Sequence, residues 1–138
     1  MTMIADIVSS EKELFKGEIH FMVAPALMGE IGILPGHAPL LTRIKTGSVS
    51  VTTPDKRIEH IFVSGGILEV QPHLVTLLAD TGIRAVDLDE AAILAAKQRA
   101  EELMENRDEL FDLAETEARL VEAIGQLRTL EKFRKSRK

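Results

Sequence analysis

The sequence predicts a β + α chain in which an N-terminal antiparallel β-sandwich (residues 1–86) precedes a C-terminal antiparallel two-helix hairpin (residues 87–138). Two patterns carry this prediction. Up to Val86 the apolar residues form short runs separated by Gly, Pro and Asp turn signals, which is typical of a sandwich or barrel. After Val86 they recur every three or four positions, which is the period of an amphipathic helix. A length of 138 residues suits one domain, or a small domain with an appendage.

Short strands are expected throughout the first part of the chain. In Thr46–Thr52 the valines share one face and the serines the other, which is the period of a half-buried strand. Pro54 and Asp55 then predict a turn, so Arg57–Val63 is the expected return strand of a hairpin. The other expected strands are Ile4–Val8, Ile19–Val23, Gly66–Gln71 and Leu74–Ala79, the last two joined by a tight reversal at Pro72-His73.

The segment Gly29–Leu41 predicts a loop that holds one shape. Its three glycines allow backbone angles that are closed to other residues, while Pro35 and Pro39 fix theirs. Two isoleucines and Leu34 make the segment too apolar for a solvated linker. We therefore expect this loop to pack against another surface.

Two helices are expected after the strands. Asp87, with Glu90 three residues later, predicts the start of the first helix. Alanines recur along it at helical spacing and predict a face that another helix can approach closely: Ala91, Ala92, Ala95, Ala96 and Ala100. A second helix is expected from about Leu110, but Glu105–Asp108 contains no Gly or Pro, so one continuous helix stays an alternative. A hairpin of this size buries too little surface alone and should dock on the sandwich or on a partner.

Composition argues against several classes of function. Only 4% of the residues are aromatic and the net charge is −5, which argues against a nucleic-acid binder. The absence of cysteine excludes disulfides and thiolate metal sites. The histidines lack the spacing of a helical zinc site, and surface or turn roles are expected for His20, His60 and His73, while His37 stands at the loop tip. We expect no metal, no cofactor, no secretory signal and, without an apolar run of roughly 18 residues, no direct membrane insertion.

Two segments resemble catalytic motifs. Asp80-Thr81-Gly82 follows apolar residues as in aspartic proteases, which need two carboxylates that share a proton. Because the chain has one copy, only a dimer could supply the pair, and a dimeric aspartic-type protease using Asp80 stays an alternative function. Ser64 precedes two glycines, but this order is not a nucleophile elbow, and we interpret Ser64 as a strand-end hydroxyl.

The C-terminus is strongly basic, and Glu131 is the only acid among its last turns. The basic residues are Arg128, Lys132, Arg134, Lys135, Arg137 and Lys138. Cations at the negative end of a helix dipole are favourable, which is the simpler interpretation. The second interpretation is a docking surface for an acidic partner segment.

Three segments ahead of the alanine-rich tail resemble, in this order, the epsilon subunit of the F-type ATP synthase: Gly29–Leu41, Ser64–Val70 and Leu77–Thr81. The resemblance runs from about Ile4 to about Leu130. It implies a non-catalytic central-stalk (rotor) subunit that couples rotation of a proton-driven ring to ATP synthesis. It also implies that the β half binds the gamma subunit and the c-ring, with Glu30 and His37 at positions that face them. A generic β-sandwich adaptor remains another alternative.

The resemblance further implies that the helical tail inhibits ATP hydrolysis. The tail would change from a compact hairpin to an extended form that engages the alpha and beta catalytic subunits. The residues that match the contact with an acidic stretch of the beta subunit are Arg128, Lys132, Arg134 and Lys135. The implied location is peripheral, on the cytoplasmic face of a bacterial inner membrane.

Some members of this family bind ATP through a Leu/Ile-Asp-x-x-Arg-Ala motif at the first helix. Here Asp89 matches the motif aspartate, but Ala92 and Ile93 stand in place of the arginine and the alanine. Because arginine is the donor best suited to a phosphate, its loss argues against a nucleotide site at Asp89.

Overall fold

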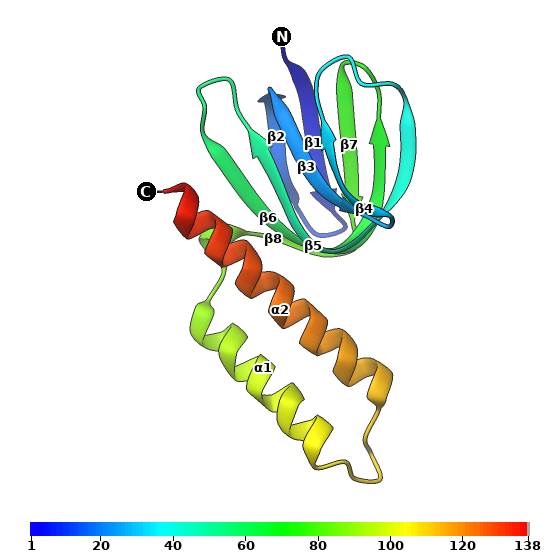
Figure 1. Ribbon diagram of the computed structural model, residues 1–138, viewed down its shortest axis with the longest axis vertical. Helices are drawn as coiled ribbons and strands as arrows, with labels where there is room; N and C mark the ends of the chain where they lie inside the picture. The colour runs from blue at the N-terminus through cyan, green and yellow to red at the C-terminus, as the bar shows by residue number, and fades with distance from the viewer. Residues whose placement is uncertain (138) are drawn as a thin grey trace.

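The structure is a computed structural model that describes residues 1–137, so Lys138 lies outside the described residues. Within this range the chain forms eight strands, one short 3-10 helix and two α-helices (Figure 1). The strands are β1 (Met3–Ser9), β2 (Glu13–Ile19), β3 (Phe21–Ala26), β4 (Gly29–Ile33), β5 (Leu40–Thr52), β6 (Ile58–Val70), β7 (Leu74–Ala79) and β8 (Gly82–Arg84). The helices are η1 (Ala85–Asp87), α1 (Glu90–Glu105) and α2 (Leu113–Ser136).

The strands form one strongly curved sheet whose two ends enclose a shared core (Figure 1), which confirms the predicted sandwich. The strand order is β2-β1-β7-β6-β5-β3-β4, with β8 also paired to β6. Neighbouring strands are antiparallel except β1 and β7, which are parallel. The long strands β5 and β6 pair throughout and connect the two ends of the sheet.

The core lies between the two layers and is built from alternate residues of the strands. The largest fully buried side chains of this core include Met3, Ile7, Ile19, Met22, Ile33, Ile61, Leu68 and Leu77. Val49 and Val51 also point into it, as the alternation in the sequence predicts. The serines on the other face of β5 lie towards α2, where Ser48 is shielded from solvent.

Several predicted strand boundaries are wrong. Residues 13–19 form β2, a strand that the sequence pattern does not predict because charged residues interrupt its apolar positions. The expected strand Ile19–Val23 is divided at His20, where the chain passes from β2 to β3. The segment Gly29–Leu41 is a loop only over residues 34–39, since its first five residues pair with β3. The strands expected on either side of Gly65 are one continuous strand, β6.

Two glycines inside β6 let the strand change its partner from β8 to β7. Gly65 and Gly66 have positive φ angles of 118° and 150°, which favour glycine. A Cβ on Gly66 would lie 2.3 Å from the carbonyl oxygen of Leu78, so β7 approaches too closely for any other residue. The face of β6 that points outward changes at these two glycines. Before them the even-numbered residues His60 and Phe62 contact α2, and after them the odd-numbered residue Ile67 faces solvent.

The C-terminal helices form the predicted hairpin, and the continuous-helix alternative is wrong because α1 ends at Asn106. Two predicted helix starts are also wrong. Asp87 ends the 3-10 helix, and the cap of α1 is Asp89, which accepts a hydrogen bond of 3.3 Å from the N–H of Ala92. The second helix begins at Leu113 rather than Leu110, because Asp112 caps it through the N–H of Glu115 at 3.1 Å.

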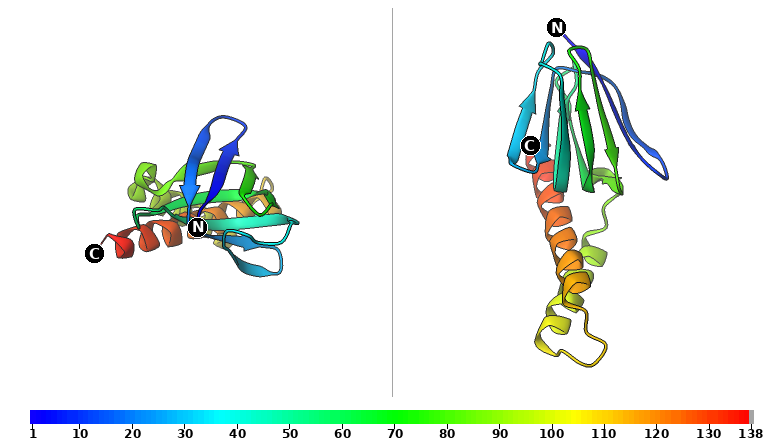
Figure 2. Two further views of the ribbon diagram at one scale, coloured as in Figure 1. Left: turned by 90° about the horizontal axis from the view of Figure 1, so that it is seen from above. Right: turned by 90° about the vertical axis from the view of Figure 1, so that its right-hand side faces the viewer.

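The hairpin docks on the sandwich through α2, while α1 packs on α2 (Figures 1 and 2). The view on the right of Figure 2 shows that the turn of the hairpin projects away from the sheet. The predicted alanine face is wrong in part. Ala91, Ala92 and Ala95 are exposed, whereas α1 meets α2 through a line that includes Ile93 and Ala100.

Candidate functional site

Large apolar side chains are exposed on the outer side of the layer formed by β1, β7, β6 and β5, where a row of polar residues (Asp6, Thr76 and Glu69) lies between them. We call this side the outer face, and its large apolar residues are Ile4, Leu41, Ile67, Leu74 and Leu78. The register places Ile4 beside Leu74 and Ile67 beside Leu78. These side chains are 36–69% exposed. Exposed apolar patches of this kind mark surfaces that bind other proteins.

The two residues expected to face the stalk and the ring lie at different places. Glu30 is exposed on β4, and its carboxylate forms an ion pair of 3.6 Å with Lys132 of α2. His37 lies in the loop of residues 34–39, where its Nδ1 is 2.7 Å from the carbonyl oxygen of Ala38. That loop is tied to the β6–β7 turn, because the N–H of Gly36 donates to the carbonyl of Pro72 at 2.8 Å. The loop and the α2 side of the sandwich are at opposite ends (Figure 1), so the structure does not bring Glu30 and His37 together.

Three of the four basic residues expected to meet an acidic partner form ion pairs within the chain. Besides the Lys132 pair, Arg134 donates to Glu90 at 2.7 Å, and Lys135 lies 3.1 Å from Glu131. Hydrogen bonding to Arg134 holds the pKa of Glu90 below its usual value. Because these pairs are exposed to solvent and screened by it, each contributes little to the stability of the fold. Such contacts can be exchanged for an external partner at little cost.

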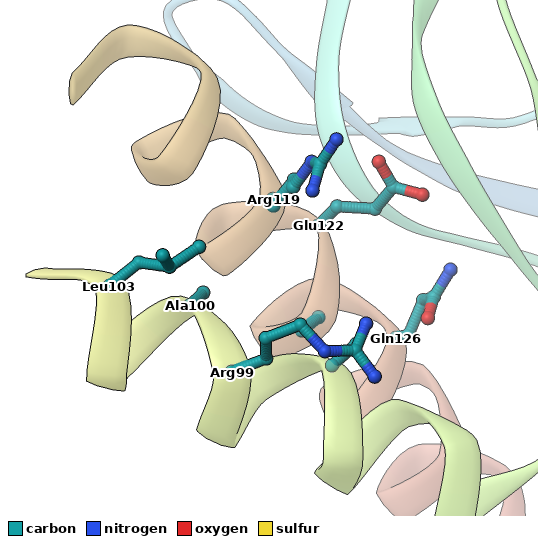
Figure 3. A pocket seen from close by; sticks show the side chains of 8 residues that line it. Arg99, Ala100, Leu103, Arg119, Glu122 and Gln126 are labelled. Carbon is teal, nitrogen blue, oxygen red and sulfur yellow. The ribbon is translucent and has the colours of Figure 1, made fainter. Parts of the chain in front are cut away.

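The nucleotide candidate Asp89 has a structural role as the cap of α1. The first arginine after Asp89 in the sequence is Arg99, which borders a hollow of about 140 Å³ between α1 and α2. Figure 3 shows Arg99 extending from α1 and Arg119, Glu122 and Gln126 from α2. Ten residues separate Asp89 from Arg99, which is about 15 Å along a helix. Arg99 therefore does not take the place of the missing motif arginine beside Asp89.

The two segments that resemble catalytic motifs, which contain Asp80 and Ser64, have structural roles at a turn. Asp80 is exposed between β7 and β8, and its N–H donates to the carbonyl of Gly65 at 2.9 Å. Oγ of Ser64 lies 2.6 Å from Oγ1 of Thr81, so the Ser64 hydroxyl forms a hydrogen bond within the chain. Both motifs thus stabilise the place where β6 changes partners.

His60 is buried, so the expected surface or turn role is wrong for this histidine. Its side chain lies beneath the last turn of α2, where Nε2 is 3.2 Å from Oγ of Ser136. Its Nδ1 is shielded from solvent and has no hydrogen-bond partner among the described residues. Burial lowers the pKa of the His60 imidazole, and the positive charge of Lys132 lowers it further.

The stability of the folded chain, in which α2 covers His60, should therefore depend on pH. The pKa of His60 is near 6.5 in an unfolded chain and lower in the folded one, so acidification protonates the unfolded state first. The free energy of unfolding should fall as the pH falls from about 7.5 to about 5.5. His60→Gln, which cannot titrate, should reduce this dependence in urea unfolding experiments. An identical pH dependence in the variant would show that the titration of His60 does not cause this loss of stability.

Among the described residues, no group of three or more metal-ligating side chains is arranged to hold an ion. None of the helices in residues 1–137 combines the length and the apolar character that crossing a membrane requires.

An exposed apolar sheet face, exposed ion pairs and a docked helical hairpin are features of a chain that binds other proteins. Comparison with known proteins identifies the class. Residues 2–85 match the family model described as the β-sandwich domain of the ATP synthase delta/epsilon chain. The chain is 54% identical over 135 residues to the ATP synthase epsilon chain of Nitrosococcus oceani, covering 98% of this chain and 96% of the relative. It is 52% identical to that of Stenotrophomonas maltophilia K279a, covering 99% and 98%.

The chain belongs to the ATP synthase epsilon chain family. Its role is that of a rotor subunit of the ATP synthase, without catalytic activity of its own. The fold is shared with a chain of the Euglena gracilis mitochondrial ATP synthase structure that contains OSCP, F1 and the c-ring. The TM-score is 0.82 at 18% identity, covering 94% of this chain and 81% of that one. A chain of the Tetrahymena thermophila central stalk and c-ring matches with a TM-score of 0.59 at 14% identity, covering 94% and 97%.

The outer face was not recognised from the sequence. Its residues come from four strands, and each strand contributes only one or two of them. The sequence did contain one indication of this surface. Leu74 and Leu78 are apolar, although they occupy the strand positions that an alternating pattern assigns to solvent.

Proposed function

We propose that the outer face binds the gamma subunit of the central stalk. The observation that carries this proposal is the exposure of five large apolar side chains on adjacent strands of a chain that belongs to a rotor subunit family. Burying these side chains against a partner gains roughly 25 cal/mol for each Å² of apolar surface removed from water. The β-sandwich, residues 1–86, is thus the stalk- and ring-binding domain.

Glu30 and His37 serve as polar contacts with the stalk and the c-ring under this proposal. The two residues approach the partners from different ends of the sandwich, so they belong to two separate contacts. The loop that carries His37 is held to the β6–β7 turn by the Gly36–Pro72 hydrogen bond, which keeps the histidine in place before a partner binds.

The helical domain, residues 87–138, regulates ATP hydrolysis by leaving its docked position. In the docked state Lys132 and Arg134 bind Glu30 and Glu90. An acidic segment of the beta subunit can offer the same carboxylates, and Arg128 forms no ion pair within the described residues that must first be broken. The switch therefore exchanges internal ion pairs for external ones. We place the assembled chain at the periphery of a bacterial inner membrane, on its cytoplasmic face.

The outer face can be tested with Leu78→Asp. Leu78 is 55% exposed, so the charge is tolerated by the folded chain, but it would be buried without a partner in the complex. We expect the affinity for an isolated gamma subunit, measured by calorimetry, to fall at least about tenfold, which corresponds to about 1.4 kcal/mol.

The matched control is Leu110→Asp, which changes a leucine that is 92% exposed in the turn of the hairpin. This variant should bind gamma as the wild-type chain does. Equal affinities for all three proteins would show that the outer face is not the stalk contact.

A further inference from the structure

A second surface, distinct from the outer face and from the hollow between the helices, lies where the sandwich meets the end of α2. It is a cavity of about 350 Å³. Three separate parts of the chain line it: residues 56–60 from the turn before β6 and its start, residues 84–86 from β8 and η1, and Phe133, Ser136 and Arg137 from the end of α2. A ligand in this cavity would contact both domains at once.

The cavity is positively charged although the chain carries a net charge of −5. Its cationic residues are Lys56, Arg57, Arg84 and Arg137, and its only acidic residue is Glu59. Arg57 is neutralised by Asp55 at 2.8 Å, and Arg84 lies 3.4 Å from Glu59. Within residues 1–137, no carboxylate lies within 4.0 Å of the charged groups of Lys56 and Arg137. The cavity therefore offers two cations to an external anion.

The backbone at Lys56 supports a role for its side chain. Lys56 has a φ of 66° and is the only residue other than glycine with a positive φ in the described chain. Glycine or asparagine is the usual residue in this conformation, because the Cβ of other residues lies too close to the following carbonyl oxygen. Lys56 lines the cavity, and it holds this backbone conformation at an energetic cost.

The walls of the cavity are apolar. Ile58 and Val86 are 44% and 54% exposed, and Ala85 and Phe133 complete the apolar part of the lining. Arg137 stacks on the Phe133 ring, with its guanidinium carbon 5.3 Å from the ring centroid. An inorganic anion would leave these walls in water, whereas an aromatic ring would cover them.

We propose that this cavity binds a small aromatic anion, a ring that carries a phosphate or carboxylate, with Lys56 and Arg137 on the anion and Ile58, Val86 and Phe133 on the ring. Because the ligand contacts the sandwich and α2 together, it stabilises the docked hairpin by RT ln(1 + L/Kd), where L is the free ligand concentration. The regulatory consequence rests on the proposed function, since a ligand that holds α2 docked opposes extension of the tail.

Phenyl phosphate, titrated into the full-length chain and followed by backbone amide NMR, tests this proposal. We expect saturable shifts at residues 56–60, 84–86 and 133–137, and slower hydrogen exchange in the last turns of α2. Phenol and inorganic phosphate alone should bind much more weakly. Lys56→Gln and Arg137→Gln should each weaken phenyl phosphate binding about tenfold, as expected for the loss of one charge-assisted hydrogen bond.

Lys12→Gln is the matched control, because it removes the same charge in the turn between β1 and β2, away from the cavity. Equal weakening by Lys12→Gln, shifts spread over the whole surface, or binding of inorganic phosphate as tight as that of phenyl phosphate would overturn the proposal. Unaltered binding in both cavity variants would overturn it too. The experiment uses the isolated chain, so its failure would leave the stalk assignment untouched.

Discussion

Gly66→Ala is expected to lower the free energy of unfolding by about 3 kcal/mol, the sum of an overpacking cost and a disfavoured backbone conformation. The added methyl group would lie 2.3 Å from the carbonyl oxygen of Leu78 and 2.9 Å from Cα of Ala79. Both atoms belong to the backbone of β7, so no side-chain rotation can make room. Either β7 moves away or the β6–β7 pairing is lost.

Gly36→Ala separates the two contributions. Gly36 also has a positive φ, of 86°, but a Cβ there meets no atom within 4 Å. This variant should lose only about 1 kcal/mol, the conformational part. Urea unfolding of both variants measures the difference, and equal losses would show that the close approach of β7 to Gly66 does not limit stability.

Gly125→Leu is expected to release α2 from the sandwich. A Cβ at Gly125 would lie 2.9 Å from Cε1 of Phe62, so a larger side chain pushes the helix off β6. An overpacking cost of about 2 kcal/mol shifts the ratio of docked to undocked hairpin roughly thirtyfold. Hydrogen exchange in α2 should accelerate. Under the proposed switch, ATP hydrolysis by the reconstituted complex should be inhibited more strongly.

Two variants make this test specific. Ala118→Leu introduces the same side chain at an exposed position of α2 and should change neither docking nor hydrolysis. Phe62→Ala combined with Gly125→Leu makes room beneath the helix and should restore part of the docking. Faster exchange in Gly125→Leu without any change in hydrolysis would contradict the regulatory role of the hairpin.

The predictable part of the fold is the part that local patterns determine. The alternation in Thr46–Thr52 predicts which side of β5 faces the core, and Val49 and Val51 are buried accordingly. Turn chemistry at Pro54 and Asp55 likewise predicts the β5–β6 hairpin, in which Asp55 accepts a hydrogen bond from Arg57 at 2.8 Å. The starts of the helices were less predictable. Asp87 and Asp89 have the same side chain and could both cap a helix, but Asp87 lies in η1, so Asp89 caps α1.

The features that sequence reasoning missed depend on residues far apart in the chain. His60 and Ser136 are 76 positions apart, so nothing local shows that this histidine is buried beneath α2. Glu30 and Lys132, which form an ion pair, are even further apart in the sequence, and each residue alone resembles a solvated surface charge. The resemblance identified the family, whereas the contacts that hold the hairpin in its docked state required the three-dimensional structure.

The most direct test of the rotor role is co-elution of the full chain with a gamma-containing catalytic complex that has been stripped of its own epsilon subunit. The stalk assignment predicts a complex with one copy of this chain for each gamma subunit. Failure to co-elute, with circular dichroism showing that the chain is folded, would contradict the assignment to the central stalk.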